Sequence, residues 1–454
     1  MKIAVIGAGI AGLSCAYRLS QARQDVTLFE AASYFGGHSN TVDVALDGVT
    51  FGVDTGFLVF NERTYPNLVK LFDELGVETA PSEMSFSVKL ARAGGSGLEW
   101  AGASLDSVFA QRANLLDPRF LRMMADILRF NRQASALVNA GAFDDSAGNA
   151  GIADMALGDW LDARNYSVQF RHWYLLPMAA CIWSCPADQM LAFPLASFLR
   201  FCHNHGLLQV RDRPQWRTVK GGARNYVDKM LAAIPSRRLL APVHSVLRGI
   251  GGIGNRGAAR PVRIDSAAGV EYFDQVVMAC HSDQALALLG DASDDERTLL
   301  SAIRYQANRA VLHTDASSLP VRRKAWSAWN YQSSAVAGRG AREGAGAVTP
   351  RVCVHYLLNL LQPLPCTTPV IVSLNPIDAP RTGSVLAEFD YAHPVFDQAA
   401  IAAQARIEQR QGVRNTWFAG AWTGYGFHED GLKSGLAVAA SLTALTTARQ
   451  HAAA

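Results

Sequence analysis

The chain has 454 residues, of which 49% are apolar and 18% are charged, the balance of a globular protein with ample core. The chain has 42 basic and 39 acidic residues, and so small an excess of positive charge gives no reason to expect a nucleic-acid partner. The seven cysteines are odd in number and scattered, which predicts free thiols in a reducing compartment. We therefore expect a soluble cytoplasmic protein without a membrane-spanning segment, for which peripheral contact with a membrane stays open.

The first thirty residues predict one βαβ unit. Lys2–Ile6 is a short apolar run that ends at Gly7, as is typical of a buried parallel strand. Ile10–Ser20 then predicts a helix, and Asp25–Phe29 predicts a second strand that is closed by Glu30.

The turn of this unit carries the pattern Gly7-Ala-Gly9-Ile-Ala-Gly12. Gly7 permits the tight turn, Gly9 lets the backbone approach a pyrophosphate, and Gly12 lets the helix pack closely on the sheet. The helix N-terminus faces the phosphates, and Glu30 is placed to accept hydrogen bonds from a ribose. The strand, the helix and the acid together predict a dinucleotide site.

A second glycine turn, Gly36-Gly37, follows the ribose-binding strand. An NAD domain needs no such turn, whereas FAD must run its ribityl chain and flavin past this point. The pair therefore favours FAD over NAD, with an ordinary surface turn as the alternative.

These motifs resemble the flavin-containing amine oxidase superfamily, which also holds phytoene desaturases and protoporphyrinogen oxidases. The resemblance covers Lys2–Val42, Val53–Leu68, the Gly-Gly turn in Thr218–Gly222 and the C-terminal motif in Trp417–Leu442. It is nearest to a bacterial branch of predicted NAD/FAD-binding amine oxidoreductases. The implied fold class is α/β: a Rossmann-type FAD-binding domain with an interleaved α+β substrate domain of helices and an antiparallel sheet.

The resemblance also implies the division of the chain into domains. The FAD-binding domain is expected to be discontinuous, and the substrate-binding domain is expected to be inserted into it in two blocks. The expected FAD-binding segments are 1–80, 215–290 and 405–454, and the expected substrate-binding segments are 81–214 and 291–404.

The C-terminal motif has physical reasons of its own to bind a flavin. Gly420 permits backbone approach, and a helix predicted from about Gly431 would point its free amides at the flavin. Asp430 is a candidate cap for that helix. His428 and Glu429 stand in the same turn, where they either contact flavin or brace the loop.

Three residues are candidates for catalysis. Trp422 stands where the family has an acidic residue, so a carboxylate contact to the ribityl or phosphate region is in doubt. Trp422 and Tyr425 either wall the substrate side of the flavin or belong to the core. Arg309 lies in a run that resembles the family strand with a lysine near the flavin; the alternative is an ordinary surface arginine.

The resemblance places Val243 against the adenine, with simple core as the alternative. The whole predicted cofactor set gathers the two glycine turns, the segment after them and the C-terminal motif. Its members are Gly7, Gly9, Ile10, Ala11, Gly12, Glu30, Ala31, Gly36, Gly37, His38, Thr55, Gly56, Phe57, Val243, Gly420, His428, Glu429 and Gly431.

The resemblance also implies non-covalent FAD, because the amine oxidases with covalent flavin place a cysteine just before the C-terminal motif, and Asp390–Gly420 contain no cysteine. No second glycine motif indicates an NAD(P)H domain, so the substrate should reduce the flavin. The run Arg171–Phe201 is rich in aromatic and aliphatic residues; it either lines a cavity for a large apolar substrate or is plain core.

Three functions stay open. The first is an FAD oxidase or dehydrogenase for a bulky apolar, lipid-like or isoprenoid substrate, with the flavin reoxidised by dioxygen, a quinone or another acceptor. The second is amine oxidation. The third is a redox-neutral isomerase or a non-enzymatic flavoprotein.

Overall fold

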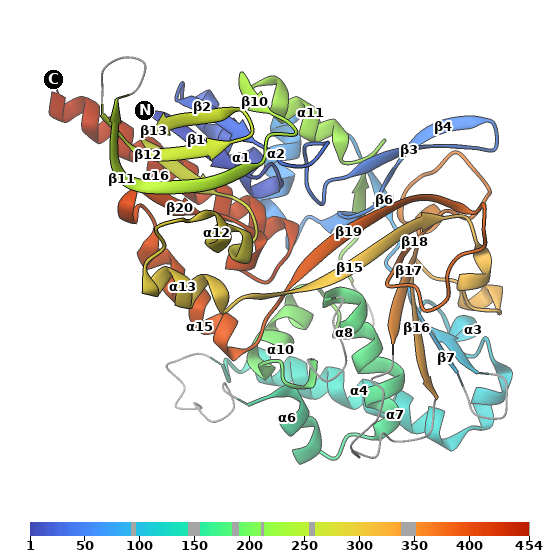
Figure 1. Ribbon diagram of the computed structural model, residues 1–454. Helices are drawn as coiled ribbons and strands as arrows, with labels where there is room; N and C mark the ends of the chain where they lie inside the picture. Colours follow the sequence, from blue (N-terminus) through green and yellow to red (C-terminus); the bar gives the residue numbers. More distant parts are fainter. Residues whose placement is uncertain are drawn as a thin grey trace.

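The computed structural model describes residues 1–91, 97–143, 155–183, 190–209, 213–253, 259–336 and 351–453. Its first layer is a five-stranded parallel sheet whose strands come from the N-terminal, middle and C-terminal parts of the chain (Figure 1). The apolar strands of this sheet are buried on both faces, as the unbroken hydrophobic runs predict. The order of its strands is β10 (Ser236–Arg238), β2 (Asp25–Phe29), β1 (Lys2–Ile6), β14 (Gln275–Met278) and β20 (Thr416–Phe418).

Two helices and a small sheet flank these strands. Helix α1 (Ile10–Gln21) packs along α16 (His428–Ala453), and the close crossing needs Gly435, because a Cβ there would overlap the carbonyl oxygen of Ala11. The small antiparallel sheet contacts β1 and β14. Its strands are β11 (Val243–Ile253), β12 (Ala259–Ser266) and β13 (Gly269–Phe273).

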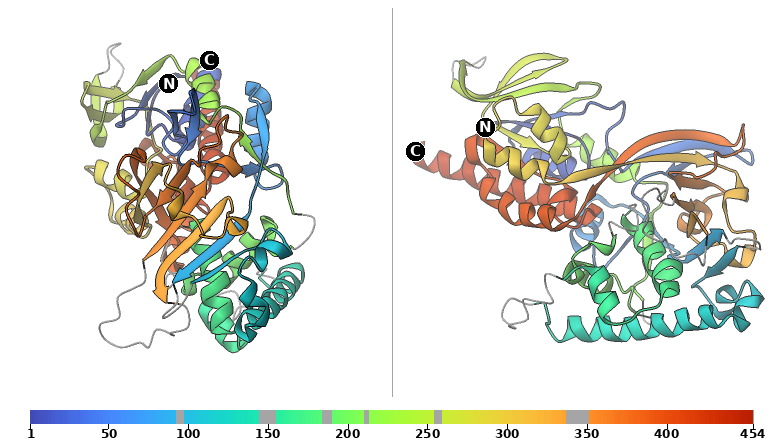
Figure 2. Two further views of the ribbon diagram at one scale, coloured as in Figure 1. Left: turned by 90° about the vertical axis from the view of Figure 1, so that its right-hand side faces the viewer. Right: turned by 60° about the horizontal axis from the view of Figure 1, so that its bottom comes forward.

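A seven-stranded mixed sheet forms the second part of the molecule (Figures 1 and 2). Its long strand pair β15–β19 runs from the five-stranded sheet toward the opposite side of the molecule. Only β16 and β7 pair in parallel, and the other neighbours are antiparallel. The strand order is β19 (Val385–Val395), β15 (Arg304–His313), β18 (Ile371–Leu374), β17 (Val352–Leu357), β16 (Trp329–Val336), β7 (Phe86–Ala91) and β8 (Leu98–Ala101).

A group of helices covers one side of this sheet, at the bottom of Figure 1. The longest is α4, which starts where Asp117 accepts a hydrogen bond from the amide of Arg119 and Pro118 fills the first helical position. The group consists of α3 (Leu105–Val108), η1 (Arg112–Leu116), α4 (Pro118–Asn139), α6 (Leu157–Ala163), α7 (Val168–Phe170), the π-helical turn η3 (Arg171–Leu175), α8 (Leu176–Trp183) and α10 (Leu195–Asn204).

Smaller elements connect the two parts. The hairpin β3–β4 and the sheet β5–β9–β6 are separate from the two large sheets, and α12 and η8 contribute residues to the cavity described below. The strands are β3 (Thr41–Leu46), β4 (Val49–Asp54), β5 (Phe60–Asn61), β6 (Thr79–Ser82) and β9 (Trp216–Val219). The helices are α2 (Pro66–Leu75), α11 (Arg224–Ala232), α12 (Ser282–Leu288), α13 (Asp294–Ser301), η4 (Ala316–Ser318), η5 (Arg323–Ala325), α14 (Leu358–Leu361), α15 (Gln398–Ile407), η6 (Glu408–Arg410), η7 (Val413–Asn415) and η8 (Ala421–Thr423).

The fold confirms the expected α/β class, with an interleaved part made of helices and a largely antiparallel sheet. β1 and β2 have the predicted bounds, and α1 runs one residue further than predicted. Helix α16 begins at His428 rather than near Gly431, because Asp430 accepts hydrogen bonds from the amides of Tyr425 and Phe427 and so organises the turn before the helix. The exact domain boundaries stay a prediction.

Candidate functional site

The glycine turn after β1 has the geometry that a bound pyrophosphate requires. Gly7 has a φ of +100°, and a Cβ there would lie 2.8 Å from the carbonyl oxygen of Ala279. A Cβ on Gly12 would overlap the carbonyl oxygen of Gly7, so this glycine serves the close packing of turn and helix. A Cβ on Gly9, by contrast, would meet no atom within 4 Å. Gly9 therefore faces open space at the N-terminus of α1, where backbone amides attract an anion.

The second glycine turn lies directly against the first. The amide of Gly36 donates to the carbonyl oxygen of Ala8 at 2.9 Å, and a Cβ on Gly37 would come within 3.1 Å of the Cα of Gly9. The carboxylate of Glu30 accepts from the amides of Ala8 (2.8 Å) and Ala32 (2.9 Å). Each oxygen of Glu30 keeps a lone pair for a further donor, such as a ribose hydroxyl.

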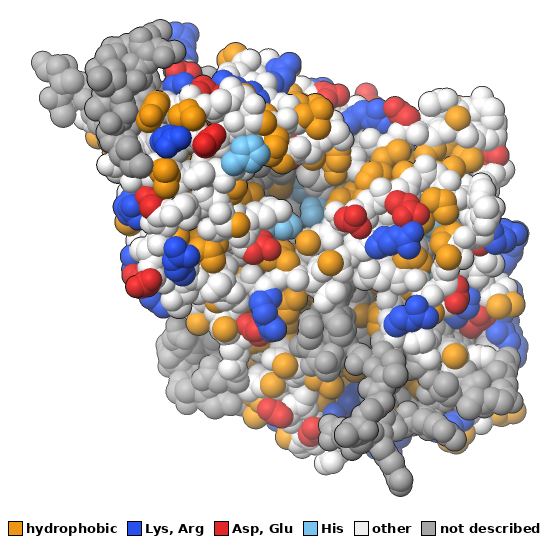
Figure 3. All heavy atoms as spheres, viewed as in Figure 1, with side chains coloured by type: hydrophobic (Ala, Val, Ile, Leu, Met, Phe, Trp, Pro, Cys, Tyr) orange, Lys and Arg blue, Asp and Glu red, His pale blue; other side chains and the backbone are white. Residues whose placement is uncertain are grey.

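One cavity of about 680 Å³ extends from these turns into the second part of the molecule. Its volume falls in the range of sites for cofactors and drug-sized ligands. The face seen in Figure 3 is hollowed at its centre, and histidine side chains are visible inside the hollow. Most of the predicted site residues line the cavity: Gly7, Gly9, Ile10, Ala11, Glu30, Ala31, Gly36, Gly37, His38, Thr55, Gly56, Phe57, Val243, Gly420, Trp422, Tyr425 and His428.

Gly12, Gly431, Glu429 and Arg309 do not line the cavity. Gly431 packs against Ile10, whose Cγ2 would lie 2.9 Å from an added Cβ, so its role is close packing, as for Gly12. The carboxylate of Glu429 accepts from three N–H groups at the start of α2: the amide and side chain of Asn67 and the amide of Leu68. Of its two predicted roles, these contacts support bracing rather than a flavin contact.

The structure does not place Arg309 beside the predicted flavin. Its side chain is exposed and pairs with Glu388 at 2.7 Å. Side chains alternate between the two faces of a strand, and in β15 the buried face carries Asn308 and Ala310. The cation that the resemblance implied is thus on the outer face of the strand pair.

The inner face carries a different group, the His393 imidazole on β19. Burial lowers the pKa of His393 to about 4, so the ring is neutral at pH 7. Its Nδ1 lies 3.0 Å from the side-chain nitrogen of Asn308. Because that nitrogen can only donate, Nδ1 of His393 accepts and Nε2 carries the proton.

A chain of hydrogen bonds fixes this tautomer. The amide of Arg309 donates to Oδ1 of Asn375, and Nδ2 of Asn375 donates to Oδ1 of Asn308 at 2.7 Å. Nδ2 of Asn308 is then left to donate to His393 and to the carbonyl oxygen of Gln306. Arg309, which was predicted to place a cation near the flavin, thus takes part in this network only through its backbone amide.

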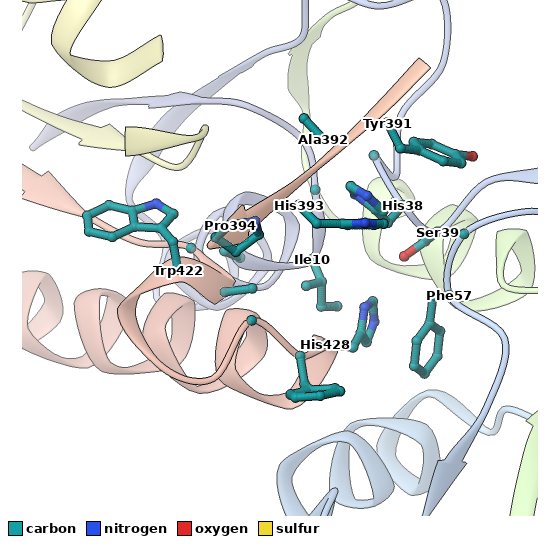
Figure 4. Close-up of a pocket in the computed structure, with 18 of the residues that line it drawn as sticks. Ile10, His38, Ser39, Phe57, Tyr391, Ala392, His393, Pro394, Trp422 and His428 are labelled. Atoms are coloured by element: carbon teal, nitrogen blue, oxygen red, sulfur yellow. The ribbon is translucent and has the colours of Figure 1, made fainter. Parts of the chain in front are cut away.

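The rings of His38 and His393 lie side by side in the cavity wall (Figure 4). The two ring centroids are 5.2 Å apart, and His38 also stacks on Tyr391 at 4.7 Å. Burial, with smaller contributions from nearby histidines such as His393, holds the pKa of His38 well below its usual range. Its Nε2 is buried and has no hydrogen-bond partner in the part of the chain that the structure describes. A buried polar atom without a partner is costly, which points to a ligand at this place.

His428 completes a row of neutral rings. It stacks on Phe57 with centroids 3.8 Å apart, and burial lowers its pKa to about 3. Its Nε2 lies 3.0 Å from the hydroxyl of Tyr226, which donates to Ser39. The imidazoles at the centre of the cavity therefore offer hydrogen bonds without a positive charge.

The two aromatic candidates lie at different places. The indole of Trp422 donates from Nε1 to the carbonyl oxygen of Cys280 at 3.1 Å and packs on Gly420, at the edge of the five-stranded sheet. Figure 4 shows it apart from Phe57 and His428, so it walls the nucleotide end of the cavity. Tyr425 is 39% exposed at the cavity wall.

The other end of the cavity is aromatic. Phe201 stacks on Phe427 (4.7 Å) and on His205 (3.9 Å), the rings of His205 and Phe427 lie 5.6 Å apart, and Trp183 packs on Phe201 at 4.6 Å. These residues belong to α8, α10 and the turn before α16, so part of the predicted run Arg171–Phe201 lines the cavity. Further lining residues at this end are Met84, Cys181, Ile182, Leu207, Trp216, Trp329, Tyr356, Leu374 and Phe396.

Charged side chains are almost absent from the wall. Among the described residues that line the cavity, Glu30 alone has a carboxylate, and none has the cationic group of Lys or Arg. The lining cysteines are protonated, since burial raises the pKa of Cys280 to about 12 and that of Cys181 well above its usual range. No group of His, Cys, Asp or Glu in the described residues could hold a metal ion.

The residues present fit FAD held without a covalent bond. The open Gly9 and the N-terminus of α1 suit a pyrophosphate, and Glu30 suits a ribose. The second turn lets the chain of the cofactor pass, and the unpartnered Nε2 of His38 awaits a polar atom. The N-terminus of α16, at His428, borders the same cavity.

Comparison with known proteins agrees with this geometry. Residues 5–75 match the model of the NAD(P)-binding Rossmann-like domain. A putative flavin-containing monoamine oxidase of Mycobacterium tuberculosis is 28% identical over 246 residues, 53% of this chain and 50% of that protein. The match thus spans about half the length of that curated relative. A 15-cis-phytoene desaturase of Synechococcus elongatus is 37% identical over 78 residues, 17% of this chain and 16% of that protein.

Solved structures extend the likeness to the whole fold. Cyclohexylamine oxidase from Brevibacterium oxydans has a TM-score of 0.66 and 16% identity, over 98% of this chain and 99% of that one. None of the described helices has the length and apolar character needed to cross a membrane. The chain therefore has the fold of the flavin-dependent amine oxidases and is similar in sequence, over part of its length, to a flavin-containing monoamine oxidase and to phytoene desaturases.

Proposed function

We propose that the protein is an FAD-dependent oxidoreductase that takes a hydride from a bulky apolar, lipid-like or isoprenoid substrate. One observation supports this most: a single cavity joins a dinucleotide cradle to an aromatic end whose wall carries no charged side chain. An alkyl or polyene chain gains roughly 25 cal/mol per Å² of apolar surface that it buries there. An ammonium group would lose its hydration without meeting a carboxylate.

FAD, when bound, supplies the hydride-accepting chemistry. The amides at the start of α1 bind the pyrophosphate, and Glu30 accepts hydrogen bonds from the ribose. The N-terminus of α16 stabilises negative charge. His393 donates a hydrogen bond from Nε2 into the cavity, and the stacked rings of Phe201 and Phe427 hold the apolar part of the substrate.

Over a full cycle the substrate loses a hydride and a proton and gains a double bond. The two electrons pass on to dioxygen, a quinone or another acceptor. No charged base lines the aromatic end among the described residues, so we propose that the substrate proton leaves through water or through a neutral histidine such as His205.

Amine oxidation is the second candidate. It is favoured by the similarity to the flavin-containing monoamine oxidase of Mycobacterium tuberculosis and by the aromatic rings of the cavity, since the face of an aromatic ring attracts a cation. The two candidates differ in the charge of the group that must enter the aromatic end.

Anaerobic mixing of the FAD-loaded protein tests the proposal. A detergent-dispersed isoprenoid such as phytoene or geranylgeraniol, or a long-chain fatty acid, is expected to bleach the flavin, whereas benzylamine and hexylamine are not. Bleaching by the amines alone would establish the second candidate instead. Failure of every probe to reduce the flavin would support a redox-neutral role.

A matched pair of variants sharpens this test. Met84→Glu adds a carboxylate to the cavity wall and should weaken reduction by the apolar probe. Val270→Glu adds the same group at an exposed position of β13 and should leave reduction unchanged.

A further inference from the structure

The outward face of α4 exposes leucines that no part of the described chain covers. Leu121 and Leu128 are seven residues apart and so lie on one side of the helix. Their side chains are 46% and 60% exposed, and Leu116, just before the helix, is 88% exposed. Figure 2 shows α4 along the edge of the molecule that lies away from the five-stranded sheet.

The inward face of the same helix is the ordinary apolar one. Phe120, Met123 and Phe130 are buried there. This face packs on α10, which lines the cavity through Phe201. The exposed leucines are thus an additional apolar face, and they lie outside the wall of the substrate end of the cavity.

Arginines surround the leucines. Arg122 and Arg132 are exposed and have no ion-pair partner among the residues that the structure describes. The carboxylate of Asp106 nearby is neutralised by Arg112 and Lys324. Arg119 likewise neutralises Asp117, and we call the remaining set the arginine–leucine face: Leu105, Leu115, Leu116, Leu121, Leu128, Arg122 and Arg132.

We propose that the arginine–leucine face docks the protein on an anionic lipid surface. Leucines that enter the interface between headgroups and acyl chains lose contact with water, and the arginines meet the lipid phosphates. A nucleic acid would match the arginines and leave the leucines in water. The inference goes beyond the proposed function, because docking needs no particular substrate.

Vesicle flotation tests this proposal directly. The full-length protein should float with vesicles of phosphatidylglycerol and phosphatidylcholine, bind less to phosphatidylcholine alone, and dissociate as salt rises. Leu116→Ser/Leu121→Ser/Leu128→Ser should abolish flotation. Arg122→Glu/Arg132→Glu should weaken binding by at least about fivefold for each arginine.

Two controls carry the same chemical changes elsewhere. Val270→Ser on β13 and Arg297→Glu on α13 alter exposed residues in the other part of the molecule and should leave flotation unchanged. Circular dichroism and flavin content check that every variant is folded. Equal flotation of the leucine variant and the wild type would overturn the proposal. So would absence of flotation, and a dimer, detected by sedimentation, that the leucine variant loses would then identify a second copy of the chain as the occupant of this face.

Discussion

The two ends of the cavity are built differently. At the nucleotide end the backbone forms the surface: Gly9, Gly36 and Gly37 bring main-chain atoms to the ligand, and Glu30 is held by two amides. At the aromatic end side chains form the surface, and stacked rings such as Phe201 and Phe427 fill it. A backbone surface needs glycines at fixed spacing, which a sequence displays, whereas a side-chain surface depends on which segments meet.

The largest expected effect is the loss of folding stability at acidic pH. An ordinary histidine has a pKa of about 6.5, and burial lowers that of His205 and His393 to about 4 and that of His428 to about 3. Between these values the unfolded chain binds more protons than the folded protein. The folded protein keeps its full stability with respect to these histidines above about pH 6.5. It loses stability as the pH falls toward 4, because the unfolded chain takes up protons that the buried rings do not.

Buried carboxyls act in the opposite direction. Burial raises the pKa of Asp54 and Asp430 to about 6, so the folded protein takes up these protons first. The buried histidines outnumber them, and the melting temperature of the apoprotein should fall steeply between about pH 6.5 and 4. His205→Phe should flatten this fall, whereas exposed His244→Asn should not. A melting temperature that stays constant over this range would contradict the account.

The second effect separates the roles of two glycines. Gly12→Ala forces a Cβ into the carbonyl oxygen of Gly7 and should cost about 3 kcal/mol of unfolding free energy. Gly9→Ala meets no atom of the protein, so its melting curve without FAD should match the wild type while its affinity for FAD falls. Differential scanning calorimetry and equilibrium FAD titration measure the two quantities. Equal FAD affinity for Gly9→Ala and wild type would show that the pyrophosphate does not bind at this turn.

The third effect concerns the neutral imidazole at the meeting point of the two ends. His393→Phe removes the Nε2 donor and should slow flavin reduction by about 100-fold, and it should shift the flavin absorption spectrum. Asn308→Leu acts only through the ring orientation and tautomer of His393, so its spectral shift should be smaller. Unchanged spectra and reduction rates in both variants would show that His393 does not face the flavin.

The smallest effect is expected at Arg309. Its exposed pair with Glu388 should contribute no more than about 1 kcal/mol, and Arg309→Ala should leave the flavin spectrum and the reduction rate as they are. A large loss of activity with intact FAD binding would restore the catalytic role that the sequence suggested.

Sequence reasoning found the nucleotide end because its signals are local. The strand Lys2–Ile6, the three glycines and Glu30 all lie within thirty residues, and the structure brings them together as predicted. It missed His393 because the partner of that ring, Asn308, lies 85 residues away and meets it only through the register of β15 and β19. The face of Arg309 depended on the same register.

The aromatic end could be predicted only as a composition. The run Arg171–Phe201 showed many rings, but nothing local indicates that Trp183 and Phe201 turn toward a cavity while Phe170 and Phe198 turn into the core. A usable signal was the scarcity of charge: before Arg200, only Arg171 and Asp188 of this run are charged at neutral pH.

The most direct test of the central claim uses two ligands of equal length and different charge. Dodecanol and dodecylamine are titrated separately into the FAD-loaded protein at neutral pH, and the flavin difference spectrum gives each dissociation constant. A wall without carboxylates at the aromatic end predicts that the neutral dodecanol binds at least about tenfold more tightly. Tighter binding of the cationic dodecylamine would contradict the account.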